Sequence, residues 1–178
     1  MRLNEIIQIT PSTEIYLDMD GVLADFFTGY QRINPNIQRP ADIPSAKNDS
    51  TLVKIVGTDF FYRLPKYRSA DQLVNTVLKY VDYYNICSSP LRGDHENAEM
   101  NKRKWIALHL SPKPREIIIT SQKQKYAVQP DGSPNILIDD KPINIEKWNN
   151  AGGIGIQYDA NTDSPVLVDG ALKRIFTQ

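Results

Sequence analysis

Residues 14–21 read Glu14-Ile15-Tyr16-Leu17-Asp18-Met19-Asp20-Gly21, and this stretch decides the fold. An apolar run that ends in acidic residues and turns at a glycine is typical of a strand buried on both faces of a sheet. Three later apolar runs also end in polar residues, at 84–88, 116–120 and 135–139. Together the four runs predict a parallel sheet whose polar strand ends lie where such sheets bind ligands.

Helical patterns separate the predicted strands. Ser69 as N-cap and the apolar spacing after it predict a helix that runs to Val81. A second helix is expected over 96–110, and a short third one over 145–150, where two glycines end it. The inward-facing residues of the second helix are expected to be Ala98, Trp105 and Leu108. This alternation predicts an α/β fold of three layers, with helices on both faces of the sheet.

Residues 26–64 interrupt the alternation of strands and helices. They contain several prolines and a polar stretch at 45–50. Because long segments of this kind in compact domains are usually functional, we interpret 26–64 as a small helical cap inserted after the first strand. Residues 1–25 and 65–178 then form the core domain. The alternative interpretation is an ordinary long surface connection.

Composition and charge exclude several classes of protein. The chain has 178 residues, of which 40% are hydrophobic and 24% charged, and this balance excludes a disordered chain. Its 21 basic and 21 acidic residues cancel, so no overall field favours nucleic acid or an acidic membrane. No apolar run is long enough to span a bilayer or to form a signal peptide. With a single cysteine, Cys87, the chain is expected to be cytoplasmic.

Four carboxylates follow two of the predicted strands. They are Asp18 and Asp20 after the first strand, and Asp139 and Asp140 after the fourth. If both strands are central in the sheet, the carboxylates converge and need a cation. Oxygen ligands without histidine or cysteine favour a hard ion such as Mg²⁺. Ser88, after the second strand, and Lys123, after the third, are placed to hold phosphoryl oxygens.

Several segments carry a resemblance to a known family. The segment Asp18-Met19-Asp20-Gly21-Val22-Leu23-Ala24-Asp25-Phe26 resembles the first motif of haloacid dehalogenase-like phosphohydrolases, and more narrowly that of the 5'(3')-deoxyribonucleotidases. Residues 86–90 are similar to the second motif and residues 135–140 to the fourth. Residues 144–148 and 151–156 are similar to the versions that bacteria and bacteriophages carry.

The resemblance implies a Mg²⁺-dependent phosphatase that works in two steps. It makes Asp18 the nucleophile, which forms an aspartyl-phosphate, and Asp20 the acid and base. It implies that Mg²⁺ is bound by the carboxylates of Asp18 and Asp139 and by the backbone carbonyl of Asp20. Asp140 is then expected to orient these ligands from behind.

The resemblance also assigns groups to the substrate. Ser88 occupies the place of the serine or threonine of the second motif, and Ser89 is expected beside the phosphate. The lysine of the third motif is Lys123 or Lys125, and the distance from the preceding strand favours Lys123. Phe26 is expected either to stack on the base of a nucleotide or to belong to the core.

The resulting reading is a phosphatase of (deoxy)nucleoside monophosphates, in the cytoplasm of a host cell if a bacteriophage encodes it. One alternative is a phosphatase of polynucleotide ends or of another small phosphomonoester, and a second is a non-catalytic binding module with the same fold. Residues 102–104, Lys-Arg-Lys, are expected to be a solvated helix face rather than a nucleic-acid patch. Base preference, 5' or 3' phosphate, deoxyribose or ribose, and formation of a homodimer stay open.

Overall fold

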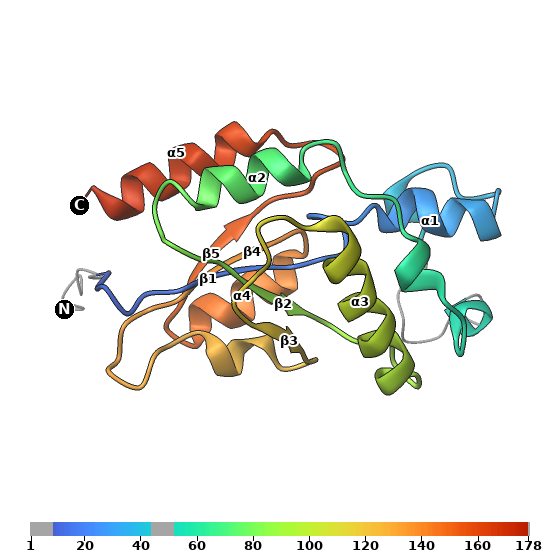
Figure 1. The fold of residues 1–178 in the computed structure, drawn as a ribbon, viewed down its shortest axis with the longest axis horizontal. Helices are drawn as coiled ribbons and strands as arrows, with labels where there is room; N and C mark the ends of the chain where they lie inside the picture. The colour runs from blue at the N-terminus through green and yellow to red at the C-terminus, as the bar shows by residue number, and fades with distance from the viewer. Residues whose placement is uncertain (1–8, 44–51, 178) are drawn as a thin grey trace.

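The computed structural model describes residues 9–43 and 52–177, and its centre is a parallel sheet of five strands (Figure 1). The strands are β1 (Ile15–Leu17), β2 (Asn85–Ser88), β3 (Ile117–Ile119), β4 (Ile136–Asp139) and β5 (Ile154–Gln157). Their order is β3-β2-β1-β4-β5, and every neighbouring pair is parallel. The predicted parallel sheet is confirmed, with β1 at its centre.

Five α-helices and four short 3-10 helices connect the strands within the described residues. The α-helices are α1 (Phe26–Ile33), α2 (Ala70–Val77), α3 (His95–His109), α4 (Pro142–Asn150) and α5 (Pro165–Phe176). The 3-10 helices are η1 (Pro40–Asp42), η2 (Leu52–Ile55), η3 (Phe60–Arg63) and η4 (Lys123–Tyr126). No helix in the described parts of the chain has the length and hydropathy of a membrane span.

The strands present alternate residues to two separate apolar clusters, because side chains in a strand point to opposite faces. One cluster joins Ile15 and Leu17 to buried residues of α2, α3 and α5. The other joins Tyr16 to Trp148 of α4. Figure 1 shows α2 and α5 side by side on one side of the sheet. The predicted arrangement in three layers is therefore confirmed.

The structure corrects one detail of α3. Ala98 and Trp105 are buried as predicted, but the side chain of Leu108 is 62% exposed. The buried face of the helix runs through Ala98, Lys102, Trp105 and Ile106, a spacing of i, i+4, i+7 and i+8. Ile106 takes the inward place beside Trp105, and Leu108 falls outside this stripe.

The segment predicted as a cap holds α1 and the 3-10 helices η1, η2 and η3. Its aromatic residues pack together: the ring of Phe26 lies 5.8 Å from that of Tyr30 and 5.3 Å from that of Phe60. In Figure 1, α1 lies at the end toward which β1 runs. The polar stretch at 45–50 lies outside the described residues, and the boundaries of the cap stay a prediction.

Candidate active site

The ends of β1 and β4 bring the predicted aspartates together. Leu17 of β1 pairs with Ile138 of β4, so the following residues, Asp18 and Asp139, lie level on neighbouring strands. The amide N–H of Asp18 donates to the carbonyl of Ile138 at 2.9 Å. The sheet register therefore places the two carboxylates side by side, although the two residues are far apart in the sequence.

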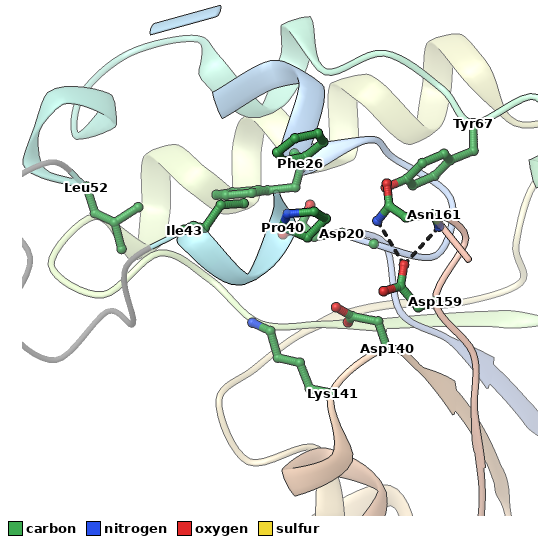
Figure 2. Close-up of a pocket in the computed structure, with 12 residues that line it drawn as sticks. Asp20, Phe26, Pro40, Ile43, Leu52, Tyr67, Asp140, Lys141, Asp159 and Asn161 are labelled. Carbon is green, nitrogen blue, oxygen red and sulfur yellow. Dashed lines mark hydrogen bonds between the residues drawn. The ribbon is translucent and has the colours of Figure 1, made fainter. Parts of the chain in front are cut away.

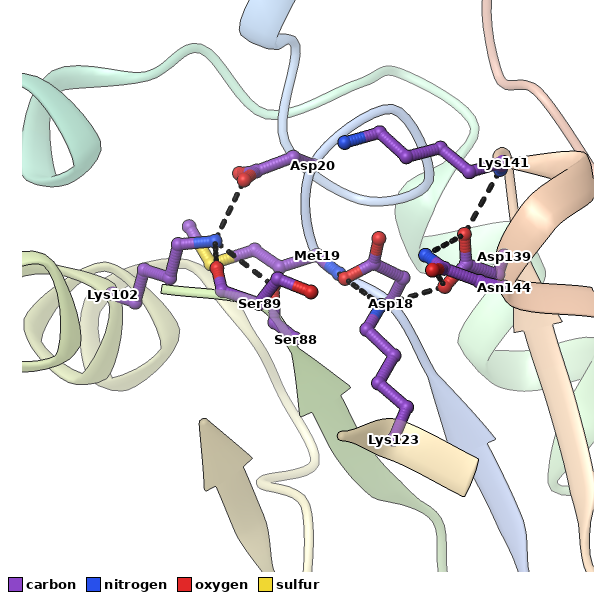
Figure 3. A network of polar contacts seen from close by, with 10 residues as sticks. All are labelled: Asp18, Met19, Asp20, Ser88, Ser89, Lys102, Lys123, Asp139, Lys141 and Asn144. Carbon is purple, nitrogen blue, oxygen red and sulfur yellow. Dashed lines mark hydrogen bonds and ion pairs between the residues drawn. The ribbon is translucent and has the colours of Figure 1, made fainter. Parts of the chain in front are cut away.

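Asp18, Asp139 and Asp140 form a carboxylate cluster, in which one oxygen from each residue lies within 4.8 Å of the others. Lys123 extends into the cluster (Figure 3). Its Nζ lies 2.6 Å from Oδ2 of Asp139 and 3.0 Å from Oδ1 of Asp18. Asn144 donates from its side-chain amide to both oxygens of Asp139 at 3.0 Å. These contacts fix Asp139 from two sides.

The charges in this cluster interact strongly because the groups are buried. Burial alone would raise the pKa of Asp18, but Lys123 and Lys102 outweigh it and hold that pKa below its usual value. Burial and the charge of Asp18 raise the pKa of Asp139. Burial, with Asp18 and Asp139 nearby, raises the pKa of Asp140 to about 8. The nearby lysines therefore do not fully offset the charge of the three carboxylates.

Gly21 lets the turn after β1 approach Asp140. Its backbone has φ +79°, a conformation that residues with a side chain rarely adopt. A Cβ at this position would lie 2.7 Å from Cγ and Oδ2 of Asp140. The glycine is therefore needed both for the turn and for the close contact between the two strand ends.

Asp20 belongs to a second polar group, centred on Lys102 of α3 (Figure 3). Nζ of Lys102 donates to Oδ2 of Asp20 at 2.6 Å, to Oγ of Ser88 at 2.9 Å and to the carbonyl of Ser89 at 2.8 Å. Oδ1 of Asp20 is buried and has no hydrogen-bond partner among the described residues. Lys102 thus joins the end of β1 to the end of β2.

The expectation of a solvated Lys-Arg-Lys face is wrong for its first member. Lys102 is fully buried, whereas Arg103 and Lys104 are exposed. The spacing of Lys102 from Ala98 and Trp105 places it on the buried stripe of α3, and this signal was present in the sequence. A lysine on an apolar stripe needs buried polar partners, and here Asp20 and two serines supply them.

Two cavities of about 450 Å³ adjoin Asp20. The first, drawn in Figure 2, is bounded on one side by apolar residues that include Phe26 and on the other by polar ones that include Asp159. The second reaches Asp18 and Ser89 and also touches Phe26. Asp20 and Phe26 therefore lie where the two cavities meet.

The structure separates the two candidate lysines and the two serines. Lys123 is buried among the carboxylates, whereas the side chain of Lys125 is exposed. Ser88 is fully buried and does not line either cavity, whereas Ser89 lines the second one. Ser88 therefore contacts Lys102, and Ser89 is the serine that faces open space.

Cys87 of β2 packs in the apolar cluster of Tyr16 and Trp148 and does not line either cavity. Its side chain is fully buried. Burial raises the pKa of the thiol to about 12, so the group stays protonated near neutral pH. Cys87 is therefore a small buried apolar residue rather than a nucleophile.

Comparisons with known proteins identify the fold. No family model matches the sequence, and no curated protein matches it. The structure is similar to a hydrolase from Streptococcus pneumoniae TIGR4, with a TM-score of 0.51 and 15% identity, over 92% of this chain and 100% of that one. It is also similar to a haloacid dehalogenase-like family hydrolase from Streptococcus pneumoniae, with a TM-score of 0.50 and 14% identity, over 84% and 85%. The likeness shows a haloacid dehalogenase-like fold.

Proposed function

We propose that this protein is a Mg²⁺-dependent phosphatase that hydrolyses nucleoside monophosphates, with a preference for deoxynucleotides, through an aspartyl-phosphate. One observation carries the proposal. Asp18 lies in the carboxylate cluster with Lys123, while Asp20, two residues later, contacts Lys102 and faces open space. One turn of chain thus presents a nucleophile and a proton donor to the same ligand.

The donor set suits Mg²⁺. The cluster offers carboxylate oxygens alone, and Oδ1 of Asp140 is buried without a hydrogen-bond partner among the described residues. Hard cations of this kind take oxygen ligands. The carboxylates of Asp18 and Asp139 and the carbonyl of Asp20 would hold the ion, and Asp140 would orient them. When bound, Mg²⁺ offsets the charge of the phosphate as the nucleophile approaches it.

The first step forms the aspartyl-phosphate. Oδ1 of Asp18 accepts from Met19 N–H at 2.7 Å and contacts Lys123, which leaves Oδ2 to attack phosphorus. The bond between phosphorus and the ester oxygen breaks, and the carboxyl group of Asp20 gives its proton to that oxygen. The positive charge of Lys123 stabilises the transferring phosphoryl group, and Ser89 lines the cavity beside it.

The second step returns the enzyme to its starting state. Asp20, now ionised, takes a proton from a water molecule, and the water oxygen attacks phosphorus. The bond between phosphorus and Asp18 breaks, and inorganic phosphate leaves. Lys102 holds Asp20 and Ser88 in place throughout, because its three acceptors fix its ammonium group.

A nucleoside suits the cavity of Figure 2. Phe26 and Phe27 give this cavity an aromatic wall next to Asp20, and its volume of about 450 Å³ is in the range of small-molecule sites. A base can stack on an aromatic ring, whereas a sugar phosphate has no flat apolar surface. The aromatic wall therefore favours a nucleotide over a smaller phosphomonoester.

Phe26→Ala is expected to lower kcat/KM for a deoxynucleoside monophosphate about 5- to 100-fold, since base stacking contributes about 1–3 kcal/mol. Hydrolysis of a small phosphate without an aromatic group should change little. Phe26→Leu is the matched control, because it keeps most of the packing against Tyr30 and Phe60 but removes the ring. It should lose nucleotide activity as well. Equal losses on both substrates would make Phe26 a packing residue.

A further inference from the structure

The cavity of Figure 2 has a polar wall opposite Phe26, formed by Tyr67, Asp159 and Asn161. Asp159 and Asn161 lie in the loop after β5. The N–H of Ala160 between them donates to the carbonyl of Gly21 at 2.9 Å. The polar wall is therefore tied directly to the turn that carries Asp20.

Hydrogen bonds connect the three side chains of the polar wall, and two of these bonds converge on Oδ1 of Asp159. The hydroxyl of Tyr67 donates to Oδ1 of Asn161 at 3.0 Å. The side-chain and backbone N–H groups of Asn161 both donate to Oδ1 of Asp159 at 2.8 Å. Oδ2 of Asp159 has no hydrogen-bond partner within 9–43 and 52–177, and Figure 2 shows it on the side of Asp140. An ionised carboxylate oxygen only accepts hydrogen bonds.

The two walls together favour a ligand that has one apolar side and one polar side. Phe26, Phe27, Ile43 and Leu52 offer apolar contact on one wall. Asp159 offers an acceptor on the other, close to the turn that carries the proton donor. Asp159 therefore suits a hydrogen-bond donor of the ligand, such as a hydroxyl, because an acceptor oxygen cannot pair with another acceptor and a second anionic group would be repelled.

We propose that Asp159 is a specificity-determining residue that accepts a hydrogen bond from a hydroxyl of the leaving group. In a nucleoside 5'-monophosphate this hydroxyl is the 3'-OH of the sugar, and in other substrates it is a hydroxyl near the phosphoester. The nucleotide form of this inference rests on the proposed function. Recognition of a hydroxyl does not need the base, so the role of Asp159 and the nucleotide substrate can be tested separately.

The test compares pairs of substrates that differ only in the hydroxyl. Wild type should prefer a 2'-deoxynucleoside 5'-monophosphate over its 2',3'-dideoxy analogue by about 10- to 100-fold in kcat/KM, the usual effect of one hydrogen bond to a charged group. Asp159→Ala should bring the ratio to within about threefold of one, chiefly by losing activity on the hydroxylated substrate. Asp163→Asn is the matched control. Asp163 accepts from Asp159 N–H at 2.8 Å but does not line the cavity, so the ratio should stay as in wild type.

Three results would overturn the proposal. The first is a wild type that does not distinguish the paired substrates, and the second is an equal loss on both substrates in Asp159→Ala. The third is an unchanged ratio with a raised Mg²⁺ requirement, which would assign Asp159 to the metal. If wild type hydrolyses no nucleotide, the proposed function fails but the proposal for Asp159 does not. The pair propane-1,2-diol 1-phosphate and propyl phosphate, which differ in one hydroxyl, then decides the proposal by the same ratio.

Discussion

Asp18→Asn is expected to lower phosphate release from a deoxynucleoside monophosphate by roughly 10⁴-fold or more, as loss of a covalent nucleophile does in other enzymes. The amide is a poor nucleophile toward phosphorus and carries no charge for the cation. Its size is nearly that of the carboxylate, so the chain should still fold. Steady-state phosphate release at saturating Mg²⁺ measures the effect.

The control for this variant is Asp131→Asn. Asp131 lies in the loop before β4, at the amino ends of the strands and away from the candidate site at their carboxyl ends, and it is exposed. Its replacement should leave turnover unchanged. Thermal melts of both variants show whether the fold is intact. A folded Asp18→Asn protein with activity within about tenfold of wild type would remove Asp18 from its proposed role, because that loss is far below the usual cost of a missing nucleophile.

Asp20→Asn is expected to lower turnover of the nucleotide about 10²–10⁴-fold, the usual contribution of a positioned acid or base. The amide oxygen can still accept from Lys102, so the polar group at the end of β2 should remain. The loss should be smaller on p-nitrophenyl phosphate, because its leaving group departs without a proton. Parallel assays with the two substrates measure the difference.

The leaving-group dependence separates two explanations of an inactive Asp20→Asn. A larger loss on the nucleotide than on the aryl phosphate supports proton transfer by Asp20. An equal loss on both would mean that Asp20 acts by holding Lys102, whose Nζ lies 2.6 Å from its carboxylate. Lys102→Met then serves as the matched variant, since it removes the partner and keeps Asp20.

The centre of the fold could be predicted from the sequence because its signals are local. Each of the four predicted strands is an apolar run, which is what a parallel strand buried on both faces requires, and polar residues follow at its carboxyl end. The parallel arrangement follows from the helices between the strands. Asp18 and Asp139 are two of these polar residues, and the pairing of β1 with β4 places them next to each other.

The last strand, whose signal is weak, was missed, and so was the last helix, although that helix has a start signal. β5 is a short edge strand that contains Gly155, and glycine is uncommon within strands. α5 did have a start signal: Ser164 caps the N–H of Val166, and Pro165 occupies the first turn. The polar wall at Asp159 and Asn161 follows β5 and was missed with it.

For Lys102, the sequence pattern indicates that the residue is buried but does not indicate its partners. Its spacing from Ala98 and Trp105 indicates a buried position on α3. Its partners, Asp20 and Ser88, are 82 and 14 residues away in the chain, and only the folded sheet brings them together. Charge alone suggested a solvated residue, since lysine is rarely buried without partners.

The central claim is most directly tested by phosphate release from a panel of nucleoside monophosphates, with Mg²⁺ and after exhaustive chelation. The panel contains deoxynucleotides, ribonucleotides and small phosphomonoesters. We expect release from deoxynucleoside monophosphates above the other substrates, loss of activity on chelation, and recovery on addition of Mg²⁺. Full activity after chelation, or activity confined to small phosphomonoesters, would contradict the proposed function.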